Sequence, residues 1–246
     1  VLLVLLKTLS LPVSESICGV LIVLFIAMLI TSQYMLSFGK DPNAKVVKKS
    51  KSPLSFHPIA IIFGILSFVS FLVEGAVGDW SALYLFEDKG IVIEEAVMGV
   101  MLFNGTMCIG RLLGNTIGKH LTSKQVVVGG YLLGAISMGL IVFLPGHASM
   151  YTYLLLGISL AMVVPNLFSA MGEQNVIPMT QAVATSTMLG YMGILMGPAL
   201  IGFIAHGTSL TIAFIVLTAL LVVSAAIGKY AYHLMSKDCG LSDAEM

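Results

Sequence analysis

The chain carries very little charge. Only 10% of its 246 residues are Asp, Glu, Lys or Arg, whereas soluble domains contain about 25%. Hydrophobic residues make up 58% of the chain, and its mean hydropathy is +1.02. This composition excludes a soluble globular domain and predicts a membrane protein with several spans. Because the formal net charge is zero, the positions of the charges are more informative than their balance.

Residues typical of metal and catalytic sites are also scarce. The three cysteines, Cys18, Cys108 and Cys239, are scattered and have neither metal-ligand spacing nor the pattern of a disulfide framework. The five histidines do not pair at ligand spacing. The sequence contains no nucleophile elbow, phosphate-binding loop or dinucleotide fingerprint. We therefore predict no metal, no cofactor and no enzymatic activity.

Long hydrophobic runs are abundant, and a membrane helix needs about 20 apolar residues. The predicted spans are 17–36, 59–86, 96–114, 126–144, 151–170, 182–205 and 211–234. The predicted fold is all-α, a polytopic transmembrane helical bundle. We expect four parts: the tail of one helix and a complete helix in 1–36, a basic linker in 37–58, a six-helix bundle in 59–235 and a polar tail in 236–246. The chain opens at Val1 inside an apolar run without a signal-peptide pattern, so we expect a fragment of a longer protein.

The basic residues are distributed unevenly among the connections. If the spans after the linker alternate in direction, one side receives Lys40, Lys45, Lys48, Lys49, Lys51, Arg111, Lys119, Lys124, Lys229 and Lys237. The other side receives only Lys7 and Lys89. Short loops rich in Lys and Arg stay in the cytoplasm, which predicts that the linker and the C-terminus are cytoplasmic. The alternative for the lysine run, a patch for nucleic acid or anionic lipid, is less favoured.

One acidic residue, Glu74, lies deep inside the run 59–86. A charge at that depth is costly and is usually retained for a pathway, a proton relay or a binding site. Ser70 and Ser81 share one helical stripe with it. A lipid-facing helix does not carry such a stripe, so we expect Ser70 and Glu74 to line a polar cleft.

The next span carries a second polar stripe. Asn104, Cys108, Arg111 and Asn115 follow one another at spacings that place them on one helical face. With a rise of about 1.5 Å per residue, Asn104 should lie at the depth of Glu74, and Arg111 roughly 10–15 Å away along the membrane normal. A direct Glu74–Arg111 ion pair is therefore not expected. Arg111 either reaches to the membrane interface or acts as a cytoplasmic gate.

Two later spans carry further candidates. Asn166 follows Pro165. Proline leaves the carbonyl four residues earlier without its helical hydrogen bond, which a membrane helix tolerates where polar groups or water can bond to that carbonyl. Asn166 is therefore a candidate for the cleft wall, and an interhelical hydrogen bond is the alternative. Gly193 and Gly197 have the spacing of close helix packing.

Asp79 and Trp80 lie near the outer end of the first span after the linker. Trp80 fits an interfacial anchor, and Asp79 either caps a neighbouring helix or gates the outer mouth. The spans 126–144 and 211–234 are almost free of polar stripes. We expect these two spans to lie outermost, as lipid-facing supports.

Several of these segments resemble the major facilitator superfamily, and specifically its C-terminal six-helix half. The residues 110–115, followed by Lys119, His120 and Lys124, look like a degenerate copy of that family's loop motif, with Asn115 and His120 where the motif usually has Asp and Arg. The stretch 74–85 is similar to the seventh helix of the YbjJ-type, fucose-permease-like bacterial branch, and 165–169 fits the same branch. The departures at Asn115 and His120 weaken the case for a charge-relay gate.

The resemblance implies two six-helix halves built from inverted three-helix repeats, with the solute bound between them near mid-membrane. It implies a bacterial inner-membrane location, and as partners the lipid bilayer, a small solute and the missing N-terminal half, but no nucleic acid. The expected function is secondary active transport of a small polar solute, sugar-like by resemblance, by alternating access. In that function Glu74, Ser70, Asn104 and Asn166 form the substrate or coupling pathway, and Asp79, Trp80, Arg111, Asn115 and Lys119 form gates or helix ends.

Two other classes of function are compatible with a bundle of membrane spans. A non-transporting membrane sensor would share the span pattern, and a membrane-embedded enzyme would need convergent catalytic groups at one depth. The sequence shows one buried acid and no catalytic partner for it. A channel is disfavoured because no filter sequence is present.

Overall fold

The structure is a computed structural model that describes residues 13–34, 57–118, 120–174 and 177–239. These residues fall into two units, 1–49 and 50–246. In the first unit α2 (Val13–Tyr34) is a single helix, as the hydrophobic run 17–36 predicts. Its apolar side chains between Leu21 and Ile30 are exposed. The linker lysines, Lys7 and the predicted helix end at 1–6 lie outside the described residues.

The second unit is a bundle of helices, and its described residues contain no strand. Its elements are α3 (Pro58–Glu87), α4 (Ile93–Leu112), α5 (Gly114–Ile117), α6 (Ser123–Phe143), α7 (Gly146–Ala161), α8 (Val163–Glu173), α9 (Met179–Gly207) and α10 (Leu210–Cys239). Six helical segments of the described chain are long and apolar enough to cross a membrane, with α7 and α8 forming one of them. The predicted all-α polytopic bundle is confirmed.

The fourth of these segments differs from the predicted span 151–170. Its helix begins earlier, at Gly146, and is interrupted at Met162, which separates α7 from α8. Pro165 has no amide hydrogen to donate to the carbonyl four residues earlier, and proline commonly ends or kinks a helix for this reason. The helix resumes where the Asn166 amide bonds to the Met162 carbonyl at 3.1 Å.

Local sequence signals explain several helix starts. Pro58 occupies the first position of α3, where its missing amide hydrogen costs nothing. Thr122 and Gln125 form a reciprocal capping box at the start of α6. Gly146, which opens α7, has a φ of 48°, in the left-handed region that glycine adopts without strain.

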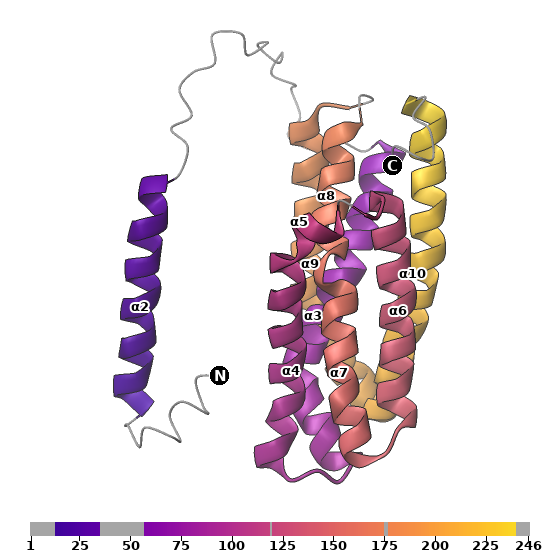
Figure 1. Ribbon diagram of the computed structural model, residues 1–246. Helices are drawn as coiled ribbons and strands as arrows, with labels where there is room; N and C mark the ends of the chain where they lie inside the picture. Colours follow the sequence, from indigo (N-terminus) through magenta and orange to yellow (C-terminus); the bar gives the residue numbers. More distant parts are fainter. Residues whose placement is uncertain (1–12, 35–56, 119, 175–176, 240–246) are drawn as a thin grey trace. The chain divides into compact units, whose positions relative to one another are not determined.

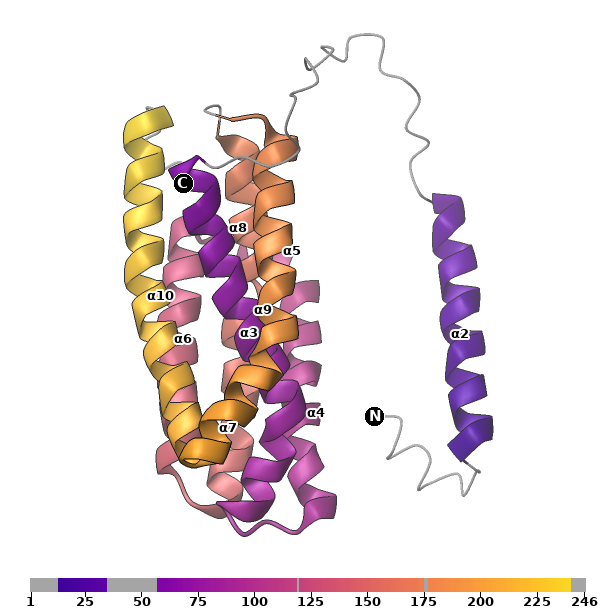
Figure 2. The ribbon, with the colours of Figure 1, turned by 180° about the vertical axis from the view of Figure 1, so that it is seen from behind.

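The bundle is organised around α3, which packs against α9, α4, α10, α8 and α7. Figures 1 and 2 show the long helices running nearly parallel or antiparallel along the bundle. The connections α3–α4, α6–α7 and α9–α10 lie together at one end, below in Figure 1, and we call this the far end of the bundle. The beginning of α3 and the end of α10 lie at the opposite end (Figure 1).

The closest helix contact joins α3 to α9. A Cβ atom added at Gly197 would lie 2.6 Å from the Leu72 carbonyl oxygen, and one at Gly193 would overlap the Phe68 carbonyl. Only glycine allows the two backbones to approach so closely. The predicted packing role of Gly193 and Gly197 is confirmed.

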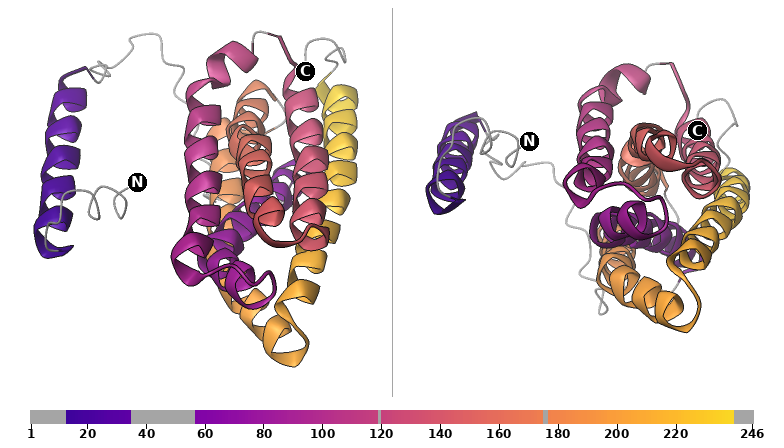
Figure 3. Two further views of the ribbon diagram at one scale, coloured as in Figure 1. Left: turned by 60° about the horizontal axis from the view of Figure 1, so that its bottom comes forward. Right: turned by 90° about the horizontal axis from the view of Figure 1, so that it is seen from below.

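The helices α6 and α10 pack side by side at one edge of the bundle (Figures 1 and 3). Both spans were expected to lie outermost as lipid-facing supports, yet α4 and α9 are less buried in this bundle than either of them. However, α6 is not featureless, because Tyr131 is fully buried and its hydroxyl donates to the Leu66 carbonyl of α3 at 2.7 Å. The same helix therefore contributes a polar contact to the interior.

Candidate functional site

An ion pair joins α3 to α4 within the apolar part of the bundle. Arg111 Nη2 lies 3.3 Å from Glu74 Oε1 and 3.5 Å from Oε2. The Glu74 side chain is 13% exposed and the Arg111 side chain 46% exposed in this bundle. The carboxylate is therefore nearly enclosed, while its cationic partner lies closer to the surface.

This pair corrects the expectation that Glu74 and Arg111 are too far apart to meet. Glu74 lies 13 residues before Glu87, the last residue of α3. Arg111 lies 18 residues after Ile93, the first residue of α4. At about 1.5 Å per residue the two therefore differ in level by only roughly 7–8 Å, less than expected. The long arginine side chain spans the remaining offset.

Ser70 does not line an open cleft with Glu74. Its side chain is fully buried, and its hydroxyl lies 2.8 Å from the Tyr131 hydroxyl of α6. Ser67 and Ser81, on the same stripe, are also fully buried. The stripe therefore points into the interior of the bundle, and Glu74 is the member of it that reaches a charged partner.

Asn104 lies on the exposed face of α4, and its side-chain amide donates to its own helix at the Val100 carbonyl, 3.0 Å away. Cys108, one turn further, is exposed as well. These positions share a face with Arg111, so the second polar stripe is accessible in this bundle.

Asn166 lies where α8 contacts the start of α6. Its side-chain oxygen accepts from Ser123 Oγ of α6 at 3.1 Å, and its amide donates to the Met162 carbonyl at 2.8 Å. This is the interhelical hydrogen bond that the sequence left open as the alternative. The structure therefore brings together Glu74 and Arg111, but not Ser70, Asn104 and Asn166.

The predicted gate residues are distributed over both ends of the bundle. Trp80 lies partly buried against α9, where its indole Nε1 donates to the Pro198 carbonyl at 3.0 Å. Asp79 is exposed. Asn115 lies in α5, with only its backbone described, and Lys119 lies outside the described residues.

The connections at the far end are joined by polar contacts that the sequence analysis did not find. Lys89 Nζ donates to the Val142 and Leu144 carbonyls at 2.6 and 2.9 Å, at the end of α6. Burial lowers the pKa of Lys89, which outweighs the raising effect of Asp88. His147 Nε2 and Glu95 Oε2 lie 2.8 Å apart, which joins the starts of α7 and α4.

No sequence signal would have identified these contacts. A lone Lys89 in an acidic loop, or a His147 after a proline, gives no indication of its partner on another connection. The Tyr131 and Ser123 contacts were missed because neither residue belongs to a polar stripe: Tyr131 lies inside the apolar run 126–144, and Ser123 lies just before it. Within the described ranges, no group of three or more His, Cys, Asp or Glu residues could hold a metal ion.

The fold and this site define a multi-pass membrane helical bundle with a charge pair between two of its spans. No protein-family model matches the chain. It is 37% identical over 216 residues to an uncharacterised MFS-type transporter of Yersinia pestis, a match that covers 86% of this chain and 54% of that protein. The chain is thus similar to a transporter of the major facilitator type.

Two further relatives are more distant. The membrane protein MosC of Rhizobium meliloti is 29% identical over 68% of this chain and 42% of its own length. The fosmidomycin resistance protein of Escherichia coli is 25% identical over 75% of this chain and 45% of its own length. The chain therefore spans about half the length of the curated relatives it matches.

Proposed function

We propose that this chain forms the C-terminal half of a major facilitator-type transporter that moves a small polar solute across a bacterial inner membrane. The observation that carries the proposal is the Glu74–Arg111 pair, which lies between two helices able to span a membrane. Charges in such helices are costly and typically serve solute or ion pathways. The names of the relatives support transport, and a sensor or an embedded enzyme is not favoured.

The pair suggests how solute or protons act on the bundle. A solute group that binds Glu74, or a proton that neutralises it, would remove the partner of Arg111. The guanidinium would then turn to the solute, to solvent or to the opposite half. Arg111 lies in the last turn of α4, and α3 is the central helix of the bundle. Exchange of the contact between Arg111 and Glu74 would therefore change how α4 is held against α3.

A second half fits the exposed side of this bundle. Among the six segments, α4 and α9 are the least buried. Only 28% and 22% of the residues in their most apolar stretches are buried inside the bundle. Leu195 and Phe203 of α9 are 77% and 81% exposed. We propose that the N-terminal half covers part of this face and that the solute binds between the halves, so that alternating access requires both.

The remaining roles belong to the same proposal. Asn104 is available to bind solute, whereas Ser70 and Asn166 would first have to exchange their bonds to Tyr131 and Ser123. Arg111, Asn115 and Lys119 would form the cytoplasmic gate, with the linker and the C-terminus on that side. A sugar-like solute rests on the family resemblance. A relative is named for fosmidomycin resistance, so fosmidomycin is a further compound to test, in both directions of transport.

The test uses the full-length protein in proteoliposomes. A thermal-shift screen over sugars, organic acids and phosphonates selects a solute, and its pH-driven accumulation is then measured for the parent and for Glu74→Gln. Glutamine keeps the size of the side chain but cannot ionise. We expect accumulation to be lost while solute exchange is partly retained. Glu94→Gln, an exposed carboxylate at the far end, is the matched control. Unchanged accumulation by a folded Glu74→Gln protein would show that the carboxylate is structural.

A further inference from the structure

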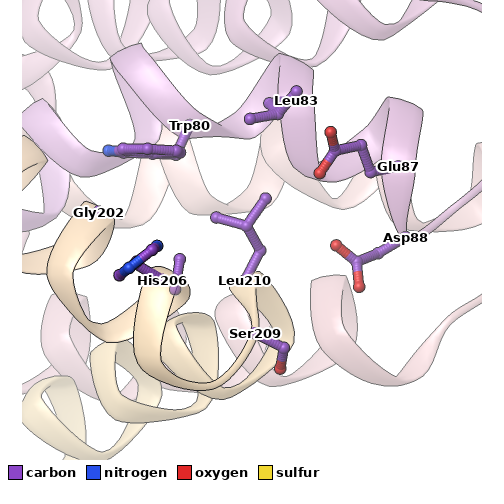
Figure 4. Close-up of a pocket in the computed structure, with 9 residues that line it drawn as sticks. Trp80, Leu83, Glu87, Asp88, Gly202, His206, Ser209 and Leu210 are labelled. Carbon is purple, nitrogen blue, oxygen red and sulfur yellow. The ribbon is translucent and has the colours of Figure 1, made fainter.

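A pocket of about 410 Å³ lies at the far end of the bundle, away from the Glu74–Arg111 pair. It is formed by the end of α3, the end of α9 and the start of α10. Its lining includes Trp80, Leu83, Glu87, Asp88, His206 and Leu210. Figure 4 shows Trp80 and Leu83 on the α3 side, facing His206 and Leu210 across the pocket.

The pocket has an acidic end and an aromatic wall. In Figure 4 the carboxylates of Glu87 and Asp88 both lie at one end, beside Leu210. Asp88 accepts one hydrogen bond, from Thr211 Oγ1 at 3.1 Å. Among the described residues neither carboxylate forms an ion pair. The neighbouring Lys89 directs its ammonium to carbonyls of α6 and lies 5.4 Å from the ring centre of Tyr84.

Trp80 is fixed as the wall of this pocket. Its Nε1 bond to the Pro198 carbonyl sets the orientation of the ring. A Cβ atom added at Gly202 would lie 2.9 Å from the indole, so glycine at this position leaves room for the ring. An indole ring offers a large apolar contact area, and its face also attracts a nearby cation. Trp80 thus contributes a rigid apolar surface near the two carboxylates.

We propose that this pocket binds an amine or quaternary ammonium group carried on an apolar body, as a site separate from the central solute pathway. The carboxylates of Glu87 and Asp88 attract the cationic group, and Trp80, Leu83 and Leu210 contact the apolar part. Under the topology proposed above, the pocket opens on the extracytoplasmic side. The same chemistry is offered by a soluble organic cation and by the ethanolamine headgroup of a lipid.

The single tryptophan of the chain provides a direct test, because Trp80 is the only one. N-methylpyridinium, a flat cation that quenches indole emission on contact, is titrated into the 246-residue chain in dodecyl maltoside micelles, which carry no charge. We expect saturable quenching of Trp80. In Glu87→Gln/Asp88→Asn the apparent affinity should fall by at least about fivefold, the size expected for partly exposed charge pairs. Acrylamide, a neutral quencher, should act equally on both proteins, which shows that the pocket is still folded.

The matched control is Glu94→Gln, which removes one exposed carboxylate at the same end of the bundle but outside the pocket. It should keep the saturable quenching. Quenching that is linear in concentration and equal in all variants would overturn the proposal.

Short-chain phosphatidylethanolamine is then added as competitor, with phosphatidylglycerol as headgroup control. Competition by the ethanolamine lipid alone supports a lipid as the natural source, and lack of competition supports a soluble cation. Competition by both lipids would mean that the acyl chains fill the pocket, which contradicts recognition of a cation.

Discussion

At the scale of single residues, the proposed function rests on the contact between Glu74 and Arg111. Glu74 and Arg111 stand out as charges in or near apolar spans, yet sequence-based depth placed them too far apart to pair. The estimated offset of roughly 10–15 Å was larger than the true one and took no account of the long arginine side chain. Partners such as Tyr131 for Ser70 and Ser123 for Asn166 depend on how helices pack, and no local pattern encodes that.

The first prediction concerns the energy of the Glu74–Arg111 pair. In a double-mutant cycle with Glu74→Gln and Arg111→Met, we expect a coupling free energy of about 1–2 kcal/mol. The value is limited because the Arg111 side chain is 46% exposed, and solvent screens such a charge. Unfolding in mixed SDS and dodecyl maltoside micelles measures it.

The control for this cycle is the pair Glu95–His147, whose side chains are 55% and 59% exposed. A cycle with Glu95→Gln and His147→Gln should give a coupling below about 0.5 kcal/mol, as is usual for exposed pairs. Equal coupling in both cycles would contradict a special role for the Glu74–Arg111 contact.

The second prediction concerns Lys89 at alkaline pH. Burial lowers the pKa of Lys89 from its ordinary value of 10.5, so just below pH 10.5 the unfolded chain holds this proton more tightly than the folded chain. Stability contributed by Lys89 should therefore rise as the pH increases through that window. The neutral amine still has two hydrogens for the Val142 and Leu144 carbonyls.

The measurement compares unfolding free energies of the parent and Lys89→Met between neutral pH and pH 10.5. The difference should move in favour of the parent as the pH increases. A difference that stays constant over the whole range would show that the ammonium is no less favourable in the folded chain than in the unfolded one.

At the scale of helices, the elements and one contact between them were predictable, and the rest of the packing was not. Apolar runs predicted each span because length and hydropathy alone determine whether a helix can cross a membrane. The spacing of Gly193 and Gly197 predicted close packing, but not that α3 would be the partner. The break at Met162 followed from Pro165, although the proline alone does not determine whether a helix kinks or separates.

The third prediction tests the α3–α9 contact. Gly193→Ala places a Cβ atom against the Phe68 carbonyl, so one backbone must move. Such overpacking costs about 1–3 kcal/mol. The matched control is Gly129→Ala in α6, where an added Cβ meets no atom within 4 Å. It should leave stability unchanged or raise it by up to about 1 kcal/mol, because alanine favours a helix over glycine. Thermal unfolding in detergent distinguishes them, and equal effects of the two substitutions would refute the close contact.

At the scale of the whole molecule, the sequence predicted a six-span bundle, while the orientation of that bundle rests on the lysine distribution. Alternating spans place Glu94 at the far end and Leu121 at the opposite end, in the connection between α5 and α6. Both residues are exposed. They are therefore suitable probes of the two sides of the membrane.

The last prediction is that these two positions react from opposite sides. Glu94→Cys and Leu121→Cys are introduced singly into a chain whose Cys18, Cys108 and Cys239 are replaced by Ser. A membrane-impermeant maleimide should label Glu94→Cys in intact cells, because few basic residues hold that end in the cytoplasm. Leu121→Cys lies between Arg111 and Lys124, so it should be labelled only after permeabilisation. Labelling of both positions from one side would contradict the alternation of spans. Exchange of the two patterns would preserve the bundle but reverse its orientation, and would place the Trp80 pocket on the cytoplasmic side.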